Sequence, residues 1–166
     1  MASLRIGLLS DTHSHMDERI LHHLDGCDEI WHAGDIGNLS VTDQLAEVAP
    51  LRVVYGNIDG AEIRTECPEY LRFEAGGARI WMTHIGGRPG RYAAGIRAGL
   101  MTVRPDYFVC GHSHLLRVGR DNSWGGVYVN PGAAGHHGFH KVRTLLRFTL
   151  SNGKMDNLEV VELGTR

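Results

Sequence analysis

The sequence predicts a single α/β domain over residues 1–166, and three observations support this class. Short apolar runs alternate with helical patterns in the first half of the chain, which is the rhythm of parallel strands covered by helices. The second half is richer in strand-like runs and contains the hairpin signal Gly76-Gly77. A chain of 166 residues, 42% of them hydrophobic, has the size and composition of one globular domain.

The first half is expected to contain three strands with two helices between them. The strands are short, mostly apolar runs at residues 4–9, 29–32 and 51–55. The helices are marked by apolar residues three or four positions apart, which are Met16, Ile20 and Leu24 in one and Val41, Leu45 and Val48 in the other. Ser40 with Asp43 three residues later indicates a capping box at the start of the second helix.

The second half is expected to be mostly strands. Residues 70–75 and 78–82 flank the Gly-Gly turn of the hairpin. Tyr92, Ile96 and Leu100 predict one further helix, which ends at Pro105. The remaining strands are expected at residues 107–110, 115–120, 126–129, 144–150 and 157–163.

Composition argues against several classes of protein. A net charge of −2 offers no basic surface for nucleic acid. No apolar run is long enough to span a membrane, and residues 1–13 read as a strand and not as a signal peptide. Cys27, Cys67 and Cys110 lack CxxC spacing and are expected to be free, mostly buried thiols in a reducing compartment, so we expect a cytoplasmic protein.

Polar side chains follow directly on five of the expected strands. Because the carboxyl ends of parallel strands meet at one edge of a sheet, we expect these side chains to converge in one crevice. Glycines beside them, which are Gly34, Gly56, Gly86 and Gly111, permit sharp turns and close backbone approach. Polar residues in ordinary loops are the alternative for any one position, but a buried group of seven needs something to satisfy it, and a metal pair does so. The seven candidate ligands are Asp11, His13, Asp35, Asn57, His84, His112 and His114.

The tetrapeptide Gly111-His112-Ser113-His114 places two of these imidazoles two residues apart. By itself it is compatible with a ligand pair or with polar residues in a turn. An extended backbone would turn both histidines to the same side and Ser113 away from it.

These motifs carry a resemblance to a known family. Asp-x-His, Gly-Asp, Gly-Asn, a lone His and Gly-His-x-His, in this order, resemble the calcineurin-like metallophosphoesterase superfamily. The phrases SDTHSH, HAGDIG, VYGNID, MTHIGG, GHSH and VNPGAAG are similar to its small bacterial and archaeal phosphodiesterase branch. The resemblance implies a four-layer α-β-β-α sandwich, in which two mixed β-sheets pack face to face and helices flank them.

The resemblance also implies two divalent metal ions. One would be held by Asp11, His13, Asp35 and His114, and the other by Asp35, Asn57, His84 and His112, so that Asp35 bridges them. Nitrogen and oxygen donors without a thiolate favour manganese, with iron, zinc, nickel and cobalt as alternatives. The implied activity is that of a phosphodiesterase, which hydrolyses a small phosphoester by in-line attack of a metal-bridging hydroxide. Asp35, Asn57 and His84 are the expected catalytic residues.

Two alternatives belong to the same fold. One is a phosphomonoesterase. The other is a non-catalytic binding scaffold similar to a eukaryotic retromer subunit, which is disfavoured because a scaffold has no reason to keep all seven ligand residues. The expected partner is a small phosphoester, with neither nucleic acid nor membrane, and a homodimer is the candidate assembly.

Two positions depart from the family pattern. Ile58 follows Asn57, where many relatives have a histidine that is thought to protonate the leaving group. An isoleucine cannot donate a proton, and His15 is a candidate substitute, with an exposed loop residue as the alternative. Ile85 follows His84, where close relatives often have His-Gly-His, and this change is expected to alter the substrate pocket and not metal binding.

Further polar residues carry weaker expectations. His32 lies within a strand and is expected to be a hydrogen-bonded residue of the core or of the support of the site. Arg88 and Arg91 are candidates to bind a phosphate oxygen, with solvated arginines as the alternative. The loop histidines that are candidates to line the pocket are His136, His137 and His140.

Overall fold

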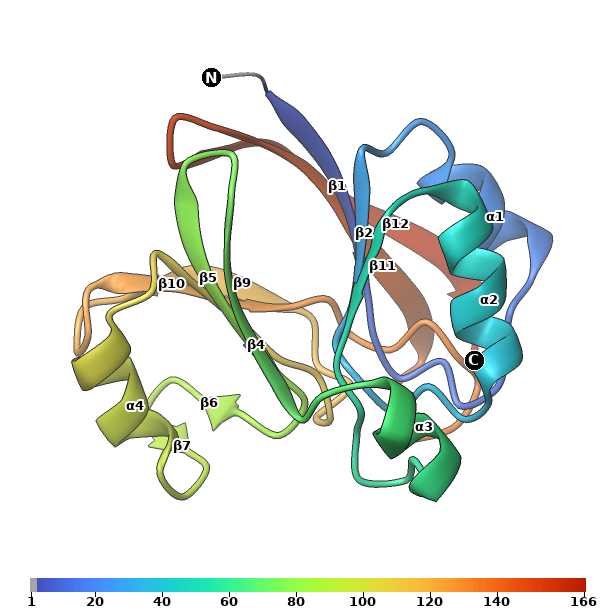
Figure 1. Ribbon diagram of the computed structural model, residues 1–166, viewed down its shortest axis with the longest axis horizontal. Coiled ribbons are helices and arrows are strands. Elements are labelled where there is room, and N and C mark those ends of the chain that lie inside the picture. The colour runs from blue at the N-terminus through green and yellow to red at the C-terminus, as the bar shows by residue number, and fades with distance from the viewer. Residues whose placement is uncertain (1–2) are drawn as a thin grey trace.

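The computed structural model describes residues 3–166, and in this part of the chain two five-stranded mixed β-sheets face each other (Figure 1). Met1 and Ala2, with which the predicted domain begins, lie outside the described residues. The first sheet consists, in spatial order, of β12 (Lys154–Thr165), β11 (Val142–Ser151), β1 (Leu4–Leu9), β2 (Glu29–His32) and β3 (Leu51–Val53). The second consists of β4 (Tyr70–Ala75), β5 (Ala78–Thr83), β8 (Tyr107–Val109), β10 (Gly126–Asn130) and β9 (Arg117–Asp121).

Helices lie outside both sheets. They are α1 (Glu18–Leu24), α2 (Leu39–Val48), α3 (Ala61–Glu66) and α4 (Ile96–Val103). A small two-stranded hairpin, β6 (Gly87–Arg88) and β7 (Arg91–Tyr92), precedes α4. In Figure 1, α1 and α2 lie beside the first sheet, and α4 lies with the hairpin near the second sheet.

Three apolar clusters hold these layers together. The alternation of β1 shows how: Ile6 and Leu8 point into the cluster between the two sheets, whereas Leu9 points to the cluster beneath α1 and α2. A third cluster packs Leu100 of α4 against aromatic residues of the second sheet, including Phe108. The predicted four-layer α-β-β-α sandwich is therefore confirmed.

Several local predictions were wrong. α2 begins at Leu39 and not at a Ser40–Asp43 capping box, because the side chain of Asn38 caps the helix by accepting a hydrogen bond from the Ser40 amide at 3.1 Å. Tyr92 lies in β7 and not in α4. Neither the short helix α3 nor the β6–β7 hairpin was predicted from the sequence.

The three cysteines are free and buried, as predicted. None of the helices within residues 3–166 is both long enough and apolar enough to cross a lipid bilayer.

The cluster between the sheets should dominate stability. Leu8 is 0% exposed within it, so Leu8→Ala is expected to lower the free energy of unfolding by about 2–5 kcal/mol. Leu158→Ala is the matched control, because this leucine is 43% exposed on β12. Its free energy of unfolding should change by no more than about 0.5 kcal/mol. Urea unfolding followed by circular dichroism measures both. Equal losses for the two variants would contradict the assignment of the core.

Candidate metal centre

The seven candidate ligands follow the carboxyl ends of five strands. β1, β2 and β3 run parallel in the first sheet, and β5 and β8 run parallel in the second. The two edges meet, since Asp11 of the first sheet lies 3.8 Å from the ring of His84 of the second. β1 is followed by Asp11 and His13, β2 by Asp35, β3 by Asn57, β5 by His84, and β8 by His112 and His114.

Six of these side chains form two clusters among residues 3–166, and within each cluster the potential ligand atoms lie within 4.8 Å of one another. The first cluster is Asp11, His13 and His114, and the second is Asp35, His84 and His112. The exposed side chain of Asn57 lies at the rim of the depression that Asp35 and His112 also line. The structure thus brings six of the seven candidate ligands together in two clusters and places Asn57 on the surface beside them.

Asp35 lies between the two clusters. Its Oδ1 is 3.2 Å from Nε2 of His84, in its own cluster, and its Oδ2 is 3.4 Å from Nε2 of His13, in the other. Oδ1 also accepts a hydrogen bond from the amide of Ile58 at 3.1 Å, which fixes the orientation of the carboxylate. Asp35 therefore lies within 3.4 Å of a histidine from each cluster.

Asp11 is oriented by hydrogen bonds to only one of its oxygens. Oδ2 accepts from the Ser10 hydroxyl at 2.6 Å and from the His112 amide at 3.1 Å. Oδ1 is buried without a hydrogen-bond partner and lies 3.1 Å from Nε2 of His114. One oxygen therefore anchors the side chain, and the other is left facing the centre.

The unpaired atoms test whether a metal ion fits. Nε2 of His13 and Nε2 of His84 are buried without a hydrogen-bond partner, as Oδ1 of Asp11 is. His84 donates its Nδ1–H to the carbonyl oxygen of Ala33 at 2.7 Å, so Nε2 of the neutral ring carries a lone pair. A lone pair that faces carboxylate oxygens is favourable only with a proton or a metal ion between them, so these atoms are suited to hold a metal ion. The donor set of nitrogen and oxygen atoms fits a divalent transition metal.

The pKa shifts of Asp11, Asp35 and His84 also indicate that the centre is suited to hold a cation. Burial raises the pKa of Asp11, but His114 and His84 outweigh it and hold that pKa below its ordinary value. Burial also raises the pKa of Asp35, and His84 outweighs it in the same way. Burial lowers the pKa of His84, yet Asp35 and Asp11 hold it above its ordinary value. The carboxylates therefore draw a proton onto His84, and a bound metal ion would replace that proton.

The backbone of the centre is strained. Five of the seven candidate ligands have a left-handed φ, which costs a residue other than glycine about 1–3 kcal/mol and persists only where the surroundings enforce it. These are Asp11 (φ 56°), His13 (45°), Asp35 (54°), His112 (67°) and His114 (60°). Such strain is concentrated at functional sites.

The conformation of the Gly-His-Ser-His segment corrects one prediction. It is not extended, because both histidines are left-handed, and successive turns direct His112 to one cluster and His114 to the other. Ser113 does not turn away but lines the same depression as the two histidines. The buried Asn130 holds the turn by donating to the Gly111 carbonyl at 3.0 Å and to the Ser113 hydroxyl at 3.1 Å.

Asp59 is a supporting residue that the sequence analysis did not single out. Its buried carboxylate accepts hydrogen bonds from three backbone amides, those of Ile36 at 3.1 Å, Gly37 at 2.9 Å and Gly56 at 2.8 Å. It thereby ties the loop of Asp35 to the loop that follows β3. Only its place in the phrase VYGNID pointed to it.

His32 is a buried supporting residue, as predicted. Burial lowers its pKa to about 4, so the ring is neutral. Its Nδ1 accepts from the Gly34 amide at 3.1 Å, and Nε2 therefore donates to the hydroxyl of Thr12 at 2.9 Å. The ring links the loops that carry Asp11 and Asp35.

The loop histidines separate into two groups. A depression of about 330 Å³ over the metal centre is lined by His137 and His140, and Ile58 lies on its rim. The ring of His137 is 4.7 Å from that of His13.

His136 instead packs on His15, whose ring is 2.8 Å from a carboxylate oxygen of Asp17. His15, the candidate substitute for a histidine at position 58, is not among the residues that line the depression over the metal centre. The remaining weaker candidates, Arg88 and Arg91, line a neighbouring groove.

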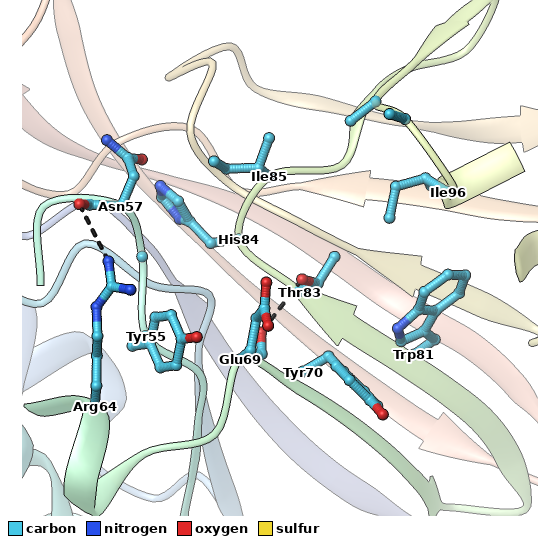
Figure 2. A pocket seen from close by; sticks show the side chains of 13 residues that line it. Tyr55, Asn57, Arg64, Glu69, Tyr70, Trp81, Thr83, His84, Ile85 and Ile96 are labelled. Atoms are coloured by element: carbon cyan, nitrogen blue, oxygen red, sulfur yellow. Dashed lines mark hydrogen bonds between the residues drawn. The ribbon is translucent and has the colours of Figure 1, made fainter.

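A second depression also adjoins the candidate ligands. It measures about 590 Å³, and His84 and Asn57 lie at one end of it (Figure 2). Trp81 and Tyr70 lie at the far end, with Glu69 and Thr83 between them and His84, and Tyr55 lies beside Arg64 (Figure 2). Aromatic walls next to the ligands provide room for an organic group attached to a phosphate.

The structure is a two-sheet α/β sandwich with a candidate metal centre at the ends of its parallel strands, and comparison with known proteins identifies its family. Residues 4–153 match the model of the calcineurin-like phosphoesterase superfamily domain. The chain belongs to this superfamily, which is metal-dependent. It is 28% identical over 135 residues to a probable metallophosphoesterase of Methanothermobacter thermautotrophicus, a match that covers 77% of this chain and 76% of the relative.

Solved structures show the same fold. An archaeal phosphodiesterase superposes with a TM-score of 0.78 at 18% identity, covering 96% of this chain and 100% of that one. Wild-type Vps29 of Entamoeba histolytica, solved in complex with zinc, superposes with a TM-score of 0.71 at 17% identity, covering 96% and 99%. At these identities the likeness concerns the fold alone.

Two glycines offer a matched test of the geometry. A Cβ atom at Gly56 would overlap Oδ1 and the backbone nitrogen of Asp35, whereas a Cβ at Gly60 would meet no atom within 4 Å. We expect Gly56→Ala to displace Asp35 and to weaken Mn²⁺ binding about 10- to 100-fold. Gly60→Ala should leave binding unchanged. Calorimetric titration with Mn²⁺ measures both, and unchanged affinity in Gly56→Ala would show that Asp35 does not hold metal in this position.

Proposed function

We propose that the protein is a dinuclear metal-dependent phosphoesterase that hydrolyses a small phosphodiester. The observation that carries the proposal is the pair of ligand clusters with Asp35 between them and with buried, unpaired acceptor atoms of Asp11, His13 and His84. Two ions held there would supply Lewis-acid stabilisation of charge on a phosphoryl group and would activate water near neutral pH.

The residues of the chain have separate tasks in this proposal. Asp35 would hold both ions, and the hydrogen bond to Ala33 keeps Nε2 of His84 free to ligate. Asn57, on the rim of both depressions, would complete the second ligand set and face the substrate. Ile58 is 46% exposed beside it and offers no proton to a leaving group. The chain is therefore suited to phosphoesters whose leaving group needs little protonation.

Metal identity, location and assembly are part of the proposal. Manganese is the first choice, with iron, zinc, nickel and cobalt as alternatives, because the candidate ligands are nitrogen and oxygen donors. We propose a cytoplasmic location from the three free, buried thiols. A homodimer stays a prediction.

Two other functions compete with this one. A phosphomonoesterase would use the same metal centre. The hydrolysis rates of a phosphomonoester and a phosphodiester that carry the same leaving group distinguish the two activities. A non-catalytic scaffold is suggested by the likeness in fold to Vps29. Because that Vps29 was solved with zinc, metal binding alone does not distinguish scaffold from enzyme, and turnover is the decisive property.

Asp35→Asn tests the bridging role. The substitution keeps the size of the side chain and removes its charge, so we expect both metal ions to be lost together. Hydrolysis of bis-p-nitrophenyl phosphate should fall about 10³-fold, because the metal contribution is worth several kcal/mol. Metal content after dialysis and the rate of nitrophenolate release are the measurements. Asp43→Asn, at an exposed position of α2, is the control and should retain both properties. Loss of one ion with normal turnover would reject the bridge.

The leaving group provides an independent test. Without a proton donor at Ile58, diesters with poor leaving groups should react far more slowly than bis-p-nitrophenyl phosphate, since general acid help is worth about 10²–10⁴-fold. Ile58→His is expected to narrow this gap. A plot of the logarithm of kcat/KM against leaving-group pKa gives the answer. A flat plot, with chemistry rate-limiting, would mean that another group donates the proton, and His137 would be the first to replace.

A further inference from the structure

A groove of about 460 Å³ adjoins the metal centre on the side of the β6–β7 hairpin. It shares the side chains of His112 and Ser113 with the depression over the centre, so a molecule bound at the centre would extend into it. Three arginines line the groove, which are Arg88 of β6, Arg91 of β7 and Arg117 of β9. No carboxylate lines it among residues 3–166.

These three guanidinium groups are not used by the fold. All three residues are exposed, and in the described part of the chain none of their side chains donates a hydrogen bond to another residue or pairs with a carboxylate. The arginines that do form ion pairs are Arg52, Arg79, Arg143 and Arg147. A concave surface with three unpaired guanidinium groups and no acid attracts anions.

The hairpin places two of these charges where they repel each other. Arg88 and Arg91 are directly opposite in the antiparallel pair β6–β7, and like charges at opposite positions are destabilising. The hairpin is nevertheless fixed, because the Tyr128 hydroxyl donates to the Gly87 carbonyl at 2.7 Å and the Ala93 amide donates to the Gly86 carbonyl at 3.0 Å. An anion between the two arginines would relieve the repulsion.

Tyr92, an aromatic residue that lines the groove, is also held in place by hydrogen bonds. The hydroxyl of Tyr92 donates to Asp121 at 2.5 Å and accepts from Nε1 of Trp124 at 2.8 Å. Asp121 is thereby occupied by Tyr92 and does not line the groove, so it does not neutralise the arginines. The three arginines come from three strands and line the same groove.

We propose that this groove is a subsite for a second phosphoryl group, so that the substrate is a phosphoester that carries a further phosphate beside the one that reacts. The inference rests on the proposed function, since it places the reacting phosphoryl group at the metal centre. Guanidinium groups bind phosphate through paired, charge-assisted hydrogen bonds, and the arrangement of Arg88 opposite Arg91 with Arg117 nearby offers such donors.

A pair of substrates that differ in one phosphate tests the subsite. They are the p-nitrophenyl ester of thymidine 5′-phosphate and the same ester with an added 3′-phosphate. The KM of the 3′-phosphorylated ester should be about 10- to 100-fold lower, as expected for charge-assisted hydrogen bonds. The triple variant Arg88→Gln/Arg91→Gln/Arg117→Gln should bring the ratio of the two KM values close to one. A charge-matched control, Arg97→Gln/Arg104→Gln/Arg120→Gln, replaces exposed arginines outside the groove and should keep the ratio.

A binding measurement separates failure of the subsite from failure of the proposed function. With metal removed by a chelator, thymidine 3′,5′-bisphosphate is expected to bind more tightly than thymidine 5′-monophosphate in calorimetric titration. The groove triple variant should lose this difference, and the control variant should keep it. If neither ester is hydrolysed while the bisphosphate preference remains, the subsite stands and the phosphoesterase proposal fails. Equal KM values together with equal affinities in the wild-type protein would overturn the subsite.

Discussion

Two carboxylates, Asp11 and Asp35, are buried side by side at the ends of neighbouring parallel strands, and the surrounding structure is arranged around them. Buried charges are costly unless they are paired, and here the partners are histidine rings whose facing nitrogens have no hydrogen bond. A cation resolves this conflict in a way that no rearrangement of neutral side chains can. The carboxylates and the histidine nitrogens that face them are thus satisfied when a cation lies between them, and a bound metal ion would supply that charge.

The loops around the centre are joined by backbone hydrogen bonds, which explains how strained ligands are kept in place. The amides of Asp11 and His13 donate to the carbonyls of Gly34 and Asp35 at 2.9 and 3.0 Å. The Gly111 amide donates to the carbonyl of His84 at 3.0 Å. The loops after β1 and β2 therefore support each other in the first sheet, and those after β5 and β8 do so in the second. A ligand set that is preorganised in this way binds metal without a further loss of backbone entropy.

Much of the site could be predicted because apolar runs mark where strands end, and parallel strand ends meet at one edge. Contacts between distant segments could not be predicted in the same way. Asp59 is one acid among many in the sequence, and its role depends on three amides from two loops. α3 has no side-chain N-cap, since Gly60 occupies that position, and the β6–β7 hairpin has two residues in each strand. Elements of this kind leave no periodic pattern.

The surface beside the centre offers two places where a substrate could extend. Aromatic residues line one depression beside the centre and three arginines line another, and the two depressions share Ile85 and Ala93. The proposed hydrolytic function depends first on the binding of two metal ions at the ligand clusters. The most direct measurement is anomalous X-ray diffraction from crystals grown with Mn²⁺. We predict two peaks about 3.5 Å apart, one at each ligand cluster, with Asp35 between them. A single peak, or two peaks that Asp35 does not contact, would contradict the account.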